Sequence, residues 1–428
     1  MGMKRIMLAL LLSVAVCAPT IAQPVFDYVN APDEAYGWEK TGQQEIGRGA
    51  TLTKLSLTSQ IWQGIRWTHR LQIITPHQMR HPQAAMLIIT GGAPSQQEYN
   101  YLSTVADMIS APVVVLGDIP NQPLFGGLTE DNLIAYTFDQ YLDTGQGDWL
   151  LLFPMTKAAV RAMDAVEEYT GQAWDVPVSS FYVTGASKRG WTTWFTAVVT
   201  PERCVGIAPM VYDNLNLSAQ MVHQVEAWGD YSEMINEYTH RGLPQRLSTQ
   251  SGRQLAEIVD PYTYRTRATM AKLIISGTND RYWPLDAANL YFNRLPEPRY
   301  LLYVPNCGHG LEDIARVLAA QVGFFAACTG QIPLPQLRWE YQDGRYLKLV
   351  ISSDVPPQKV TQWTADSPTR DFRAAVWQQA PTHLHQGKYL AHVRYPKHGY
   401  RAVFGEAVYD FQGTKLIFCT SVRIVKAD

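Results

Sequence analysis

The sequence of 428 residues carries almost no net charge. Its 36 lysines and arginines face 38 acidic residues, which leaves a formal net charge of −2. A chain without a basic excess lacks the surface with which proteins bind nucleic acid or anionic membranes, so neither is expected as its main partner. The remaining composition, 46% hydrophobic and 17% charged residues, is that of an ordinary globular protein. Long repeats and low-complexity tracts are also missing.

Long apolar runs are absent apart from a short one near the N-terminus. Residues 6–16 form an apolar run of 11 residues behind Lys4 and Arg5, which is too short to span a bilayer. A basic start, a short apolar stretch and a small residue such as Ala22 together predict a signal peptide over residues 1–22. We therefore expect cleavage after Ala22, export to the periplasm or the exterior, and no transmembrane segment in the mature protein.

Cysteine is scarce, and no metal-ligand pattern is visible. After signal removal the cysteines are Cys204, Cys307, Cys328 and Cys419. In an oxidising compartment four cysteines allow three sets of disulfide pairs, and the sequence does not select one. Cys307 either fixes its loop or competes as a nucleophile. His383 and His385 form an H-x-H pair without a further ligand at suitable spacing, so we predict neither a metal nor a cofactor.

The most informative stretch is residues 181–194, which read FYVTGASKRGWTTW. A β-prone run ends at a serine flanked by small residues, and a helix-compatible run follows, as in the nucleophile elbow of an α/β-hydrolase. Gly185 and Gly190 would remove the clashes that a strained turn at Ser187 creates. The spacing is G-x-S-x-x-G, with Arg189 where the second glycine of G-x-S-x-G stands. We predict Ser187 as the nucleophile; the alternative is an ordinary strand–turn–helix.

An acid and a histidine follow in the order that such a site requires. Residues 272–276 and 300–304 are short apolar strands, and Asp280 and His309 come just after them. Because ligand chemistry in open α/β sheets gathers at the carboxyl ends of the strands, both side chains are expected at one edge. Asp280 and His309 therefore complete a predicted Ser-His-Asp triad, and Asp286 is the second choice for the acid.

Candidate oxyanion donors and cations surround the predicted nucleophile. The backbone N–H of Lys188 would open the helix after Ser187, and a second donor would come from Gly92 or Ala93, which follow the strand predicted at residues 85–90. A plain turn at these glycines is the alternative. The cations of Lys188 and Arg189 would either bind an acidic substrate group or pair with a nearby carboxylate.

The order of the predicted elements indicates two domains after the signal peptide. Strands alternate with helices through residues 23–330, which predicts an α/β-hydrolase-type, mostly parallel sheet. Residues 214–266 interrupt this alternation with helical stretches and are expected to form a lid. After a proline-marked linker, residues 331–428 show short strands, one of them at 372–377, and predict a small, separate β-sandwich. On this view the chemistry needs only the first domain.

Four segments carry a resemblance to a known family. They are VTGASKRGWTTW (183–194), VDPYTYRTR (259–267), TSQIWQGIRWTH (58–69) and FDYVNAPDEAYGWE (26–39). From Phe26 onward most of the chain resembles the PhoPQ-activated pathogenicity-related protein family. The resemblance implies an α/β-hydrolase-like fold, export, and a link to virulence and to resistance against membrane-active host peptides. It also implies Ser187, Asp280 and His309 as nucleophile, acid and histidine.

One departure from the family pattern concerns the substrate pocket. After the acid the family commonly has Glu-Phe-Phe, whereas this chain has Arg281, Tyr282 and Trp283. We therefore predict Tyr282 and Trp283 as substrate-binding residues, together with Arg189 and the lid residue Trp228. Two functions follow. The first is an exported serine hydrolase, an esterase or peptidase-like enzyme acting on a small molecule or peptide; the second is a non-catalytic binding protein of the cell envelope.

Overall fold

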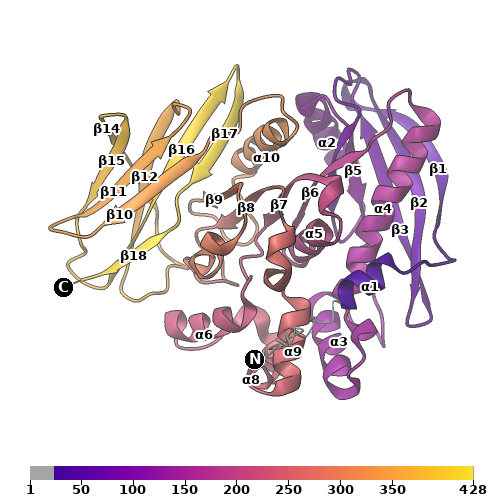
Figure 1. Cartoon of the computed structure of the whole chain (residues 1–428), viewed down its shortest axis with the longest axis horizontal. Coiled ribbons are helices and arrows are strands. Elements are labelled where there is room, and N and C mark those ends of the chain that lie inside the picture. Colours follow the sequence, from indigo (N-terminus) through magenta and orange to yellow (C-terminus); the bar gives the residue numbers. More distant parts are fainter. Residues whose placement is uncertain (1–23, 428) are drawn as a thin grey trace, which may run out of the picture.

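The computed structural model describes residues 24–427 and consists of one long sheet, a second small sheet and the helices around them (Figure 1). The signal peptide predicted for residues 1–22 lies outside the described residues. In the long sheet the strand order is β1-β2-β3-β5-β4-β6-β7-β8-β9-β17-β16-β12-β13, with β18 paired to β16. The small sheet has the order β10-β11-β15-β14. This is the mixed, mostly parallel α/β-hydrolase architecture that the sequence predicted, followed by antiparallel strands.

The centre of the long sheet is parallel and buried on both faces. Its parallel strands are β4 (Ala84–Ile89), β5 (Val113–Leu116), β6 (Ser180–Ala186), β7 (Cys204–Met210), β8 (Ala271–Gly277) and β9 (Arg299–Val304). Every residue of β8 is buried, as expected for a strand covered by helices on both sides. The carboxyl ends of β6 to β9 therefore meet at one edge, and this edge carries Ser187, Asp280 and His309.

An antiparallel extension precedes the parallel centre. It consists of β1 (Gly37–Ile46), β2 (Ala50–Trp62) and β3 (Ile65–Thr75). Gln63 and Gly64 connect β2 to β3, and both have positive φ angles, of 49° and 73°. This is the two-residue turn whose twist matches that of a hairpin. The alternation of apolar and polar residues over 51–75 is typical of such a half-buried antiparallel pair.

Helices cover both faces of the parallel strands. The described helices of this part are α1 (Pro24–Asn30), α2 (Gln96–Ile109), α3 (Glu130–Thr144), α4 (Leu152–Ala173), α5 (Lys188–Val199) and α10 (Ile314–Cys328). Along β6, Thr184 faces Gln321 of α10, and the neighbouring Gly185 faces Arg189 of α5. Because neighbouring residues of a strand point to opposite faces, α10 and α5 lie on opposite sides of the sheet.

The insertion between β7 and β8 is helical but broken into short pieces. It contains α6 (Leu217–Trp228), α7 (Asn236–Thr239), α8 (Leu243–Arg246) and α9 (Gln250–Val259). The first of them, α6, ends at Trp228, where Gly229 adopts a positive φ of 83° and caps the helix. In Figure 1 α6, α8 and α9 lie together at the end of the molecule below the sheet.

The C-terminal strands form two facing layers, one of which continues the central sheet. The strands are β10 (Leu337–Gln342), β11 (Leu347–Ser353), β12 (Lys359–Ser367), β13 (Gln378–Pro381), β14 (His383–His385), β15 (Lys388–Val393), β16 (Tyr400–Phe411), β17 (Thr414–Cys419) and β18 (Arg423–Lys426). The sequence predicted a separate β-sandwich, but one of its layers is joined to the central sheet. The connection is the antiparallel pairing of β17 with β9, at Cys419 and Leu301. The ring of Phe418 stacks on Tyr300 with 4.1 Å between the ring centroids.

Residues 372–377 differ from their prediction as a strand. They form a loop between β12 and β13, although Phe372 and Trp377 are buried. Backbone groups of this loop bond to side-chain amides of Asn279 and Asn306 instead of to a neighbouring strand. A short, mostly apolar segment can read as a strand in the sequence, but here side-chain amides take the place of a neighbouring strand, which explains the difference.

A buried carboxylate, Asp213, joins the strands at the carboxyl edge. It follows β7, accepts a 2.7 Å hydrogen bond from the hydroxyl of Tyr291, and lies 3.4 Å from the hydroxyl of Ser276. Burial raises the pKa of Asp213 to about 7, and the negative charge of Asp280 adds to this effect. Folding therefore favours the protonated form of Asp213.

We predict that Asp213 makes stability fall as pH rises. The unfolded chain releases this proton near the ordinary pKa of 3.8, whereas the folded protein holds it up to about pH 7. Stability from this group is therefore lost between about pH 4 and pH 7. Asp213→Asn cannot ionise, so its melting temperature relative to wild type should rise from pH 5 to pH 8. Thermal unfolding at both pH values measures this difference, and a constant difference would contradict the prediction.

Candidate functional site

Ser187 lies at a strained turn between β6 and α5. Its φ of 57° and ψ of −126° belong to a region that residues with a side chain rarely occupy. A Cβ atom at Gly185 would stand 2.7 Å from the carbonyl oxygen of Arg189, and one at Gly190 would stand 2.9 Å from that of Met210. Both glycines are therefore required by close backbone approach, which confirms the steric reason given for them from the sequence.

Asp280 and His309 form a hydrogen-bonded pair in the loops after β8 and β9. The distance from Nδ1 of His309 to Oδ2 of Asp280 is 2.8 Å, and the Asp280 side chain is only 4% exposed. The other carboxylate oxygen of Asp280 accepts a 2.8 Å hydrogen bond from the backbone N–H of Tyr282. A Cβ atom at Gly277 would come within 2.4 Å of the carbonyl oxygens of Cys307 and Gly308. This close contact brings the two loops together.

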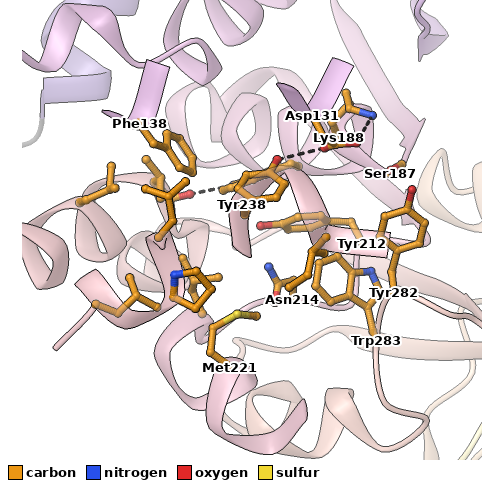
Figure 2. A pocket seen from close by; sticks show the side chains of 18 residues that line it. Asp131, Phe138, Ser187, Lys188, Tyr212, Asn214, Met221, Tyr238, Tyr282 and Trp283 are labelled. Carbon is orange, nitrogen blue, oxygen red and sulfur yellow. Dashed lines mark hydrogen bonds and ion pairs between the residues drawn. The ribbon is translucent and has the colours of Figure 1, made fainter. Parts of the chain in front are cut away.

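The structure does not join Ser187 to His309. Among the residues described, no hydrogen bond links the two side chains, and Nε2 of His309 is enclosed without a partner. The ring of Tyr282 packs on the His309 ring with 4.1 Å between the centroids. Figure 2 shows the hydroxyl of Tyr282 pointing toward Ser187. The acid–histidine pair is thus assembled, and Tyr282 lies at the approach to the serine.

A mainly apolar cavity opens beside Ser187 (Figure 2). Its lining comes from the elbow, α3, the helices of the insertion and the loop after Asp280. The aromatic residues that line it are Phe138, Trp191, Tyr212, Tyr238, Tyr282 and Trp283. The predicted substrate-binding residues Tyr282 and Trp283 therefore lie in its wall. Met221 and Leu255 belong to helices of the insertion, so this segment covers the cavity.

The cations beside Ser187 are used in ion pairs. Nζ of Lys188 lies 2.8 Å from Glu130 and 3.0 Å from Asp131, and the guanidinium of Arg189 holds Glu130 through two hydrogen bonds of 2.8 Å. Burial alone would raise the pKa of Glu130, but the bonds and charges of Arg189 and Lys188 outweigh it and lower the pKa to about 2. Of the two alternatives from the sequence, pairing with carboxylates is the one observed. Arg189 is not among the residues that line the cavity.

The loop expected to supply the second oxyanion donor makes other contacts in the structure. The backbone N–H of Gly92 donates to the hydroxyl of Thr90 at 3.1 Å, and neither Gly92 nor Ala93 is among the residues lining the cavity. A Cβ atom at Gly91 would stand 2.4 Å from the Arg189 guanidinium. This loop therefore packs against Arg189, and the oxyanion role of Gly92 and Ala93 stays a prediction.

Two further predicted residues lie away from the cavity. Trp228 stacks on the guanidinium of Arg373, 4.3 Å from its ring centroid. Asp286, the second choice for the acid, bonds to Nε2 of His223 at 2.7 Å and to Arg370 at 2.8 Å. Both therefore connect the insertion and the acid loop to the C-terminal strands, because Arg370 and Arg373 precede β13.

The sequence did not predict several residues that lie near the site. The acidic pair Glu130 and Asp131 was signalled only by its place at the start of a helix, where carboxylates are common. Asn279 and Asn306 gave no signal, since their partners are distant in sequence. In residues 24–427 no group of three or more His, Cys, Asp or Glu side chains is placed to hold a metal ion, and no helix is long and apolar enough to cross a membrane.

All four cysteines in the described part of the chain are free thiols: Cys204, Cys307, Cys328 and Cys419. Cys307 is buried in the histidine loop, where its sulfur accepts a 3.4 Å hydrogen bond from the backbone N–H of Asp313. Burial raises the pKa of the Cys307 thiol, which disfavours the reactive thiolate. Cys307 is therefore a poor rival to Ser187.

Comparison with solved structures finds several esterases of similar architecture. Acetyl xylan esterase 1 from Thermoanaerobacterium sp. JW/SL YS485 has a TM-score of 0.46 and 16% identity, covering 70% of this chain and 90% of that chain. S-formylglutathione hydrolase from Agrobacterium tumefaciens has a TM-score of 0.46 and 14% identity, covering 67% and 98%.

Comparison of sequences identifies the family. The chain is 34% identical over 451 residues to autocrine proliferation repressor protein A of Dictyostelium discoideum, which covers 95% of this chain and 90% of that protein. Residues 25–373 match the family described as PhoPQ-activated pathogenicity-related protein, and this match continues past the predicted linker into the C-terminal strands. The chain therefore belongs to the PhoPQ-activated pathogenicity-related protein family.

Proposed function

We propose that the protein is an exported serine hydrolase that cleaves an ester or amide bond through Ser187, His309 and Asp280. The observation that carries this proposal is the backbone of Ser187, with φ of 57° and ψ of −126° between a buried strand and a buried helix. Such strain persists in folded proteins chiefly where the surroundings impose it and function uses it. The Asp280–His309 pair at the same sheet edge supports the assignment.

The reaction follows from these groups. Oγ of Ser187 attacks the carbonyl carbon while Nε2 of His309 takes its proton, and Asp280 holds the ring through Nδ1 and stabilises the imidazolium. The proton then passes to the leaving alcohol or amine, and water hydrolyses the acyl-enzyme by the same route. Because Nε2 of His309 has no partner, its approach to Ser187 breaks no existing bond. The backbone N–H of Lys188, at the start of α5, is the proposed oxyanion donor.

The cavity indicates the substrate class. Its wall is mainly aliphatic and aromatic, and its polar groups at the Ser187 end, Asp131 and Lys188, are already paired. A charged substrate group placed there would have to be desolvated without a free partner, which is costly. We therefore assign the cavity to an apolar acyl or aromatic group of an ester or amide.

The first prediction for this function concerns the nucleophile. Ser187→Ala should abolish covalent labelling by a fluorophosphonate and lower kcat for a p-nitrophenyl ester by about 10⁴–10⁶-fold. The melting temperature should not fall, because the change removes only a hydroxyl from a strained residue. Labelling is read by gel fluorescence and mass spectrometry of the modified peptide.

Matched variants show whether the effect is specific. Ser251→Ala changes an exposed serine of α9 and should label like wild type. Cys307→Ser should also keep its labelling, since the thiol is not the proposed nucleophile. Labelling of the Ser187→Ala variant at the wild-type level would show that Ser187 is not the nucleophile.

The second prediction concerns the cavity. Met221 of α6 is 7% exposed and lines it, whereas its neighbour Val222 is 60% exposed on the outer face. Met221→Trp should fill space needed by long acyl chains and lower kcat/KM for p-nitrophenyl octanoate about 10–100-fold, with much less effect on the acetate. Val222→Trp is the control on the same helix. Equal losses of kcat/KM for both esters would contradict the assignment of the cavity to the acyl chain.

One observation favours the alternative of a non-catalytic binding protein. No hydrogen bond joins Ser187 to His309 in the described residues, and Tyr282 packs on the histidine. A fold alone does not imply catalysis. Wild-type protein that resists fluorophosphonate and hydrolyses no ester of the p-nitrophenyl series would support this alternative, in which the apolar cavity binds a ligand without turnover.

A further inference from the structure

The loop between β12 and β13 contacts both loops that carry the proposed catalytic pair. We call residues 370–377 the clamp segment. Asn279, which directly precedes Asp280, donates from Nδ2 to the carbonyl oxygen of Ala375 at 2.7 Å and to that of Arg373 at 3.2 Å. The backbone N–H of Asn279 in turn donates to the carbonyl of Cys307 in the histidine loop at 2.9 Å. Asn279, which belongs to the loop that carries Asp280, is therefore bonded both to the clamp segment and to the histidine loop.

Asn306 makes the corresponding contact from the histidine loop. Its Oδ1 accepts a 2.7 Å hydrogen bond from the backbone N–H of Trp377, and its Nδ2 donates to the carbonyl oxygen of Trp377 at 3.2 Å. The side chain thus pairs with a backbone as a neighbouring strand would. Asn306 has a positive φ of 59°, a conformation that asparagine tolerates better than most residues. It lies three residues before His309.

The clamp segment is itself firmly held. Phe372 and Trp377 are buried. Arg370 pairs with Asp286 of the acid loop at 2.8 Å, and Arg373 pairs with Glu233 of the insertion at 2.9 Å. The segment is therefore anchored in the core at both ends and bonded to the insertion in the middle. Such an anchored segment is a rigid support for the loops that bond to it.

We propose that the clamp segment positions Asp280 and His309 through Asn279 and Asn306, so that the C-terminal part of the chain is needed for the chemistry. The inference rests on the proposed function of that pair. The 2.8 Å bond between Asp280 and His309 tolerates little displacement, and misplacement of a catalytic group by about 1 Å can cost about 100-fold in rate. Neither Asn279 nor Asn306 lines the cavity beside Ser187, so we assign them a positioning role.

This inference changes the role expected of the C-terminal strands. From the sequence, residues 331–428 were expected to form a separate unit with the chemistry complete before residue 330. The structure instead shows side chains of the acid and histidine loops bonded to residues 372–377. Because β17 also pairs with β9, removal of the tail would disturb the core. The inference is therefore tested by point variants of the full chain.

The test compares three asparagines that each bond to a backbone carbonyl of the C-terminal part. Asn279→Ala removes the donor beside Asp280. Asn306→Gly removes the side chain beside the histidine loop and keeps a residue suited to the positive φ. Asn289→Ala is the control, because the Asn289 side chain donates to the carbonyl of Val422 at 2.9 Å and not to the clamp segment. The readouts are fluorophosphonate labelling rate, kcat and KM for p-nitrophenyl acetate, melting temperature, and hydrogen exchange of residues 277–283 and 304–311.

The expected result separates positioning from folding. Asn279→Ala and Asn306→Gly should each lower kcat and the labelling rate about 10–100-fold, with KM within about two-fold of wild type and exchange of both loops accelerated. Asn289→Ala should change neither exchange nor kcat, even if its melting temperature falls as much. Asn306→Asp keeps the acceptor for the Trp377 N–H but sets a carboxylate oxygen against the Trp377 carbonyl, so its kcat should fall as well.

Other results would overturn the inference or the function it rests on. Unchanged loop exchange in the Asn279 and Asn306 variants, or faster exchange with wild-type kcat, would overturn the positioning role. A loss of kcat in Asn289→Ala equal to theirs would also overturn it, since the effect would then be one of stability. Wild-type protein that neither labels nor hydrolyses esters would instead refute the proposed function, and loop exchange alone would then decide whether the clamp segment holds the two loops.

Discussion

The whole site depends on the close approach of backbones around Ser187. Ser187 has a positive φ of 57° at the turn from β6 to α5. At positions 185 and 190 only glycine fits, because a Cβ atom would clash with the carbonyl oxygens of Arg189 and Met210. Strain of this kind costs of order 1–3 kcal/mol and persists only where the surroundings impose it. The packing of α5 against β6 and β7 is therefore what presents the hydroxyl at the sheet edge.

The parts of the fold that sequence reasoning predicted are those governed by local pattern. The short, mostly apolar run of β8 predicts a strand that ends just before Asp280, and the run of β9 does the same for His309. Parallel neighbours end at a common edge, so two strand ends predict one site without any knowledge of distances. The hairpin at Gln63 and Gly64 was predictable for the same reason, because its turn is encoded by adjacent residues.

The parts that escaped prediction are those set by partners far apart in sequence. The pairing of Glu130 with Lys188 and Arg189 joins α3 to the elbow, and neither segment carries a pattern that selects the other. Likewise residues 372–377 are mostly apolar, as a strand can be, but their backbone bonds to the amides of Asn279 and Asn306 and not to a neighbouring strand. The strand that pairs with β9 was also not predictable, since any antiparallel strand could have covered that edge. In the structure β17 pairs with β9, so the edge is not exposed.

Arg373 links the insertion to the C-terminal part and to the loop that carries Asp280. Arg373 donates to Glu233 beside the short helices that cover the cavity, its guanidinium lies on Trp228, and its carbonyl accepts from Asn279. A displacement of the insertion would therefore act on the same backbone that bonds to the residue before Asp280. The segment that covers the cavity and the position of Asp280 are thus linked through Arg373, and a loop without a contact to the C-terminal strands would lack this link.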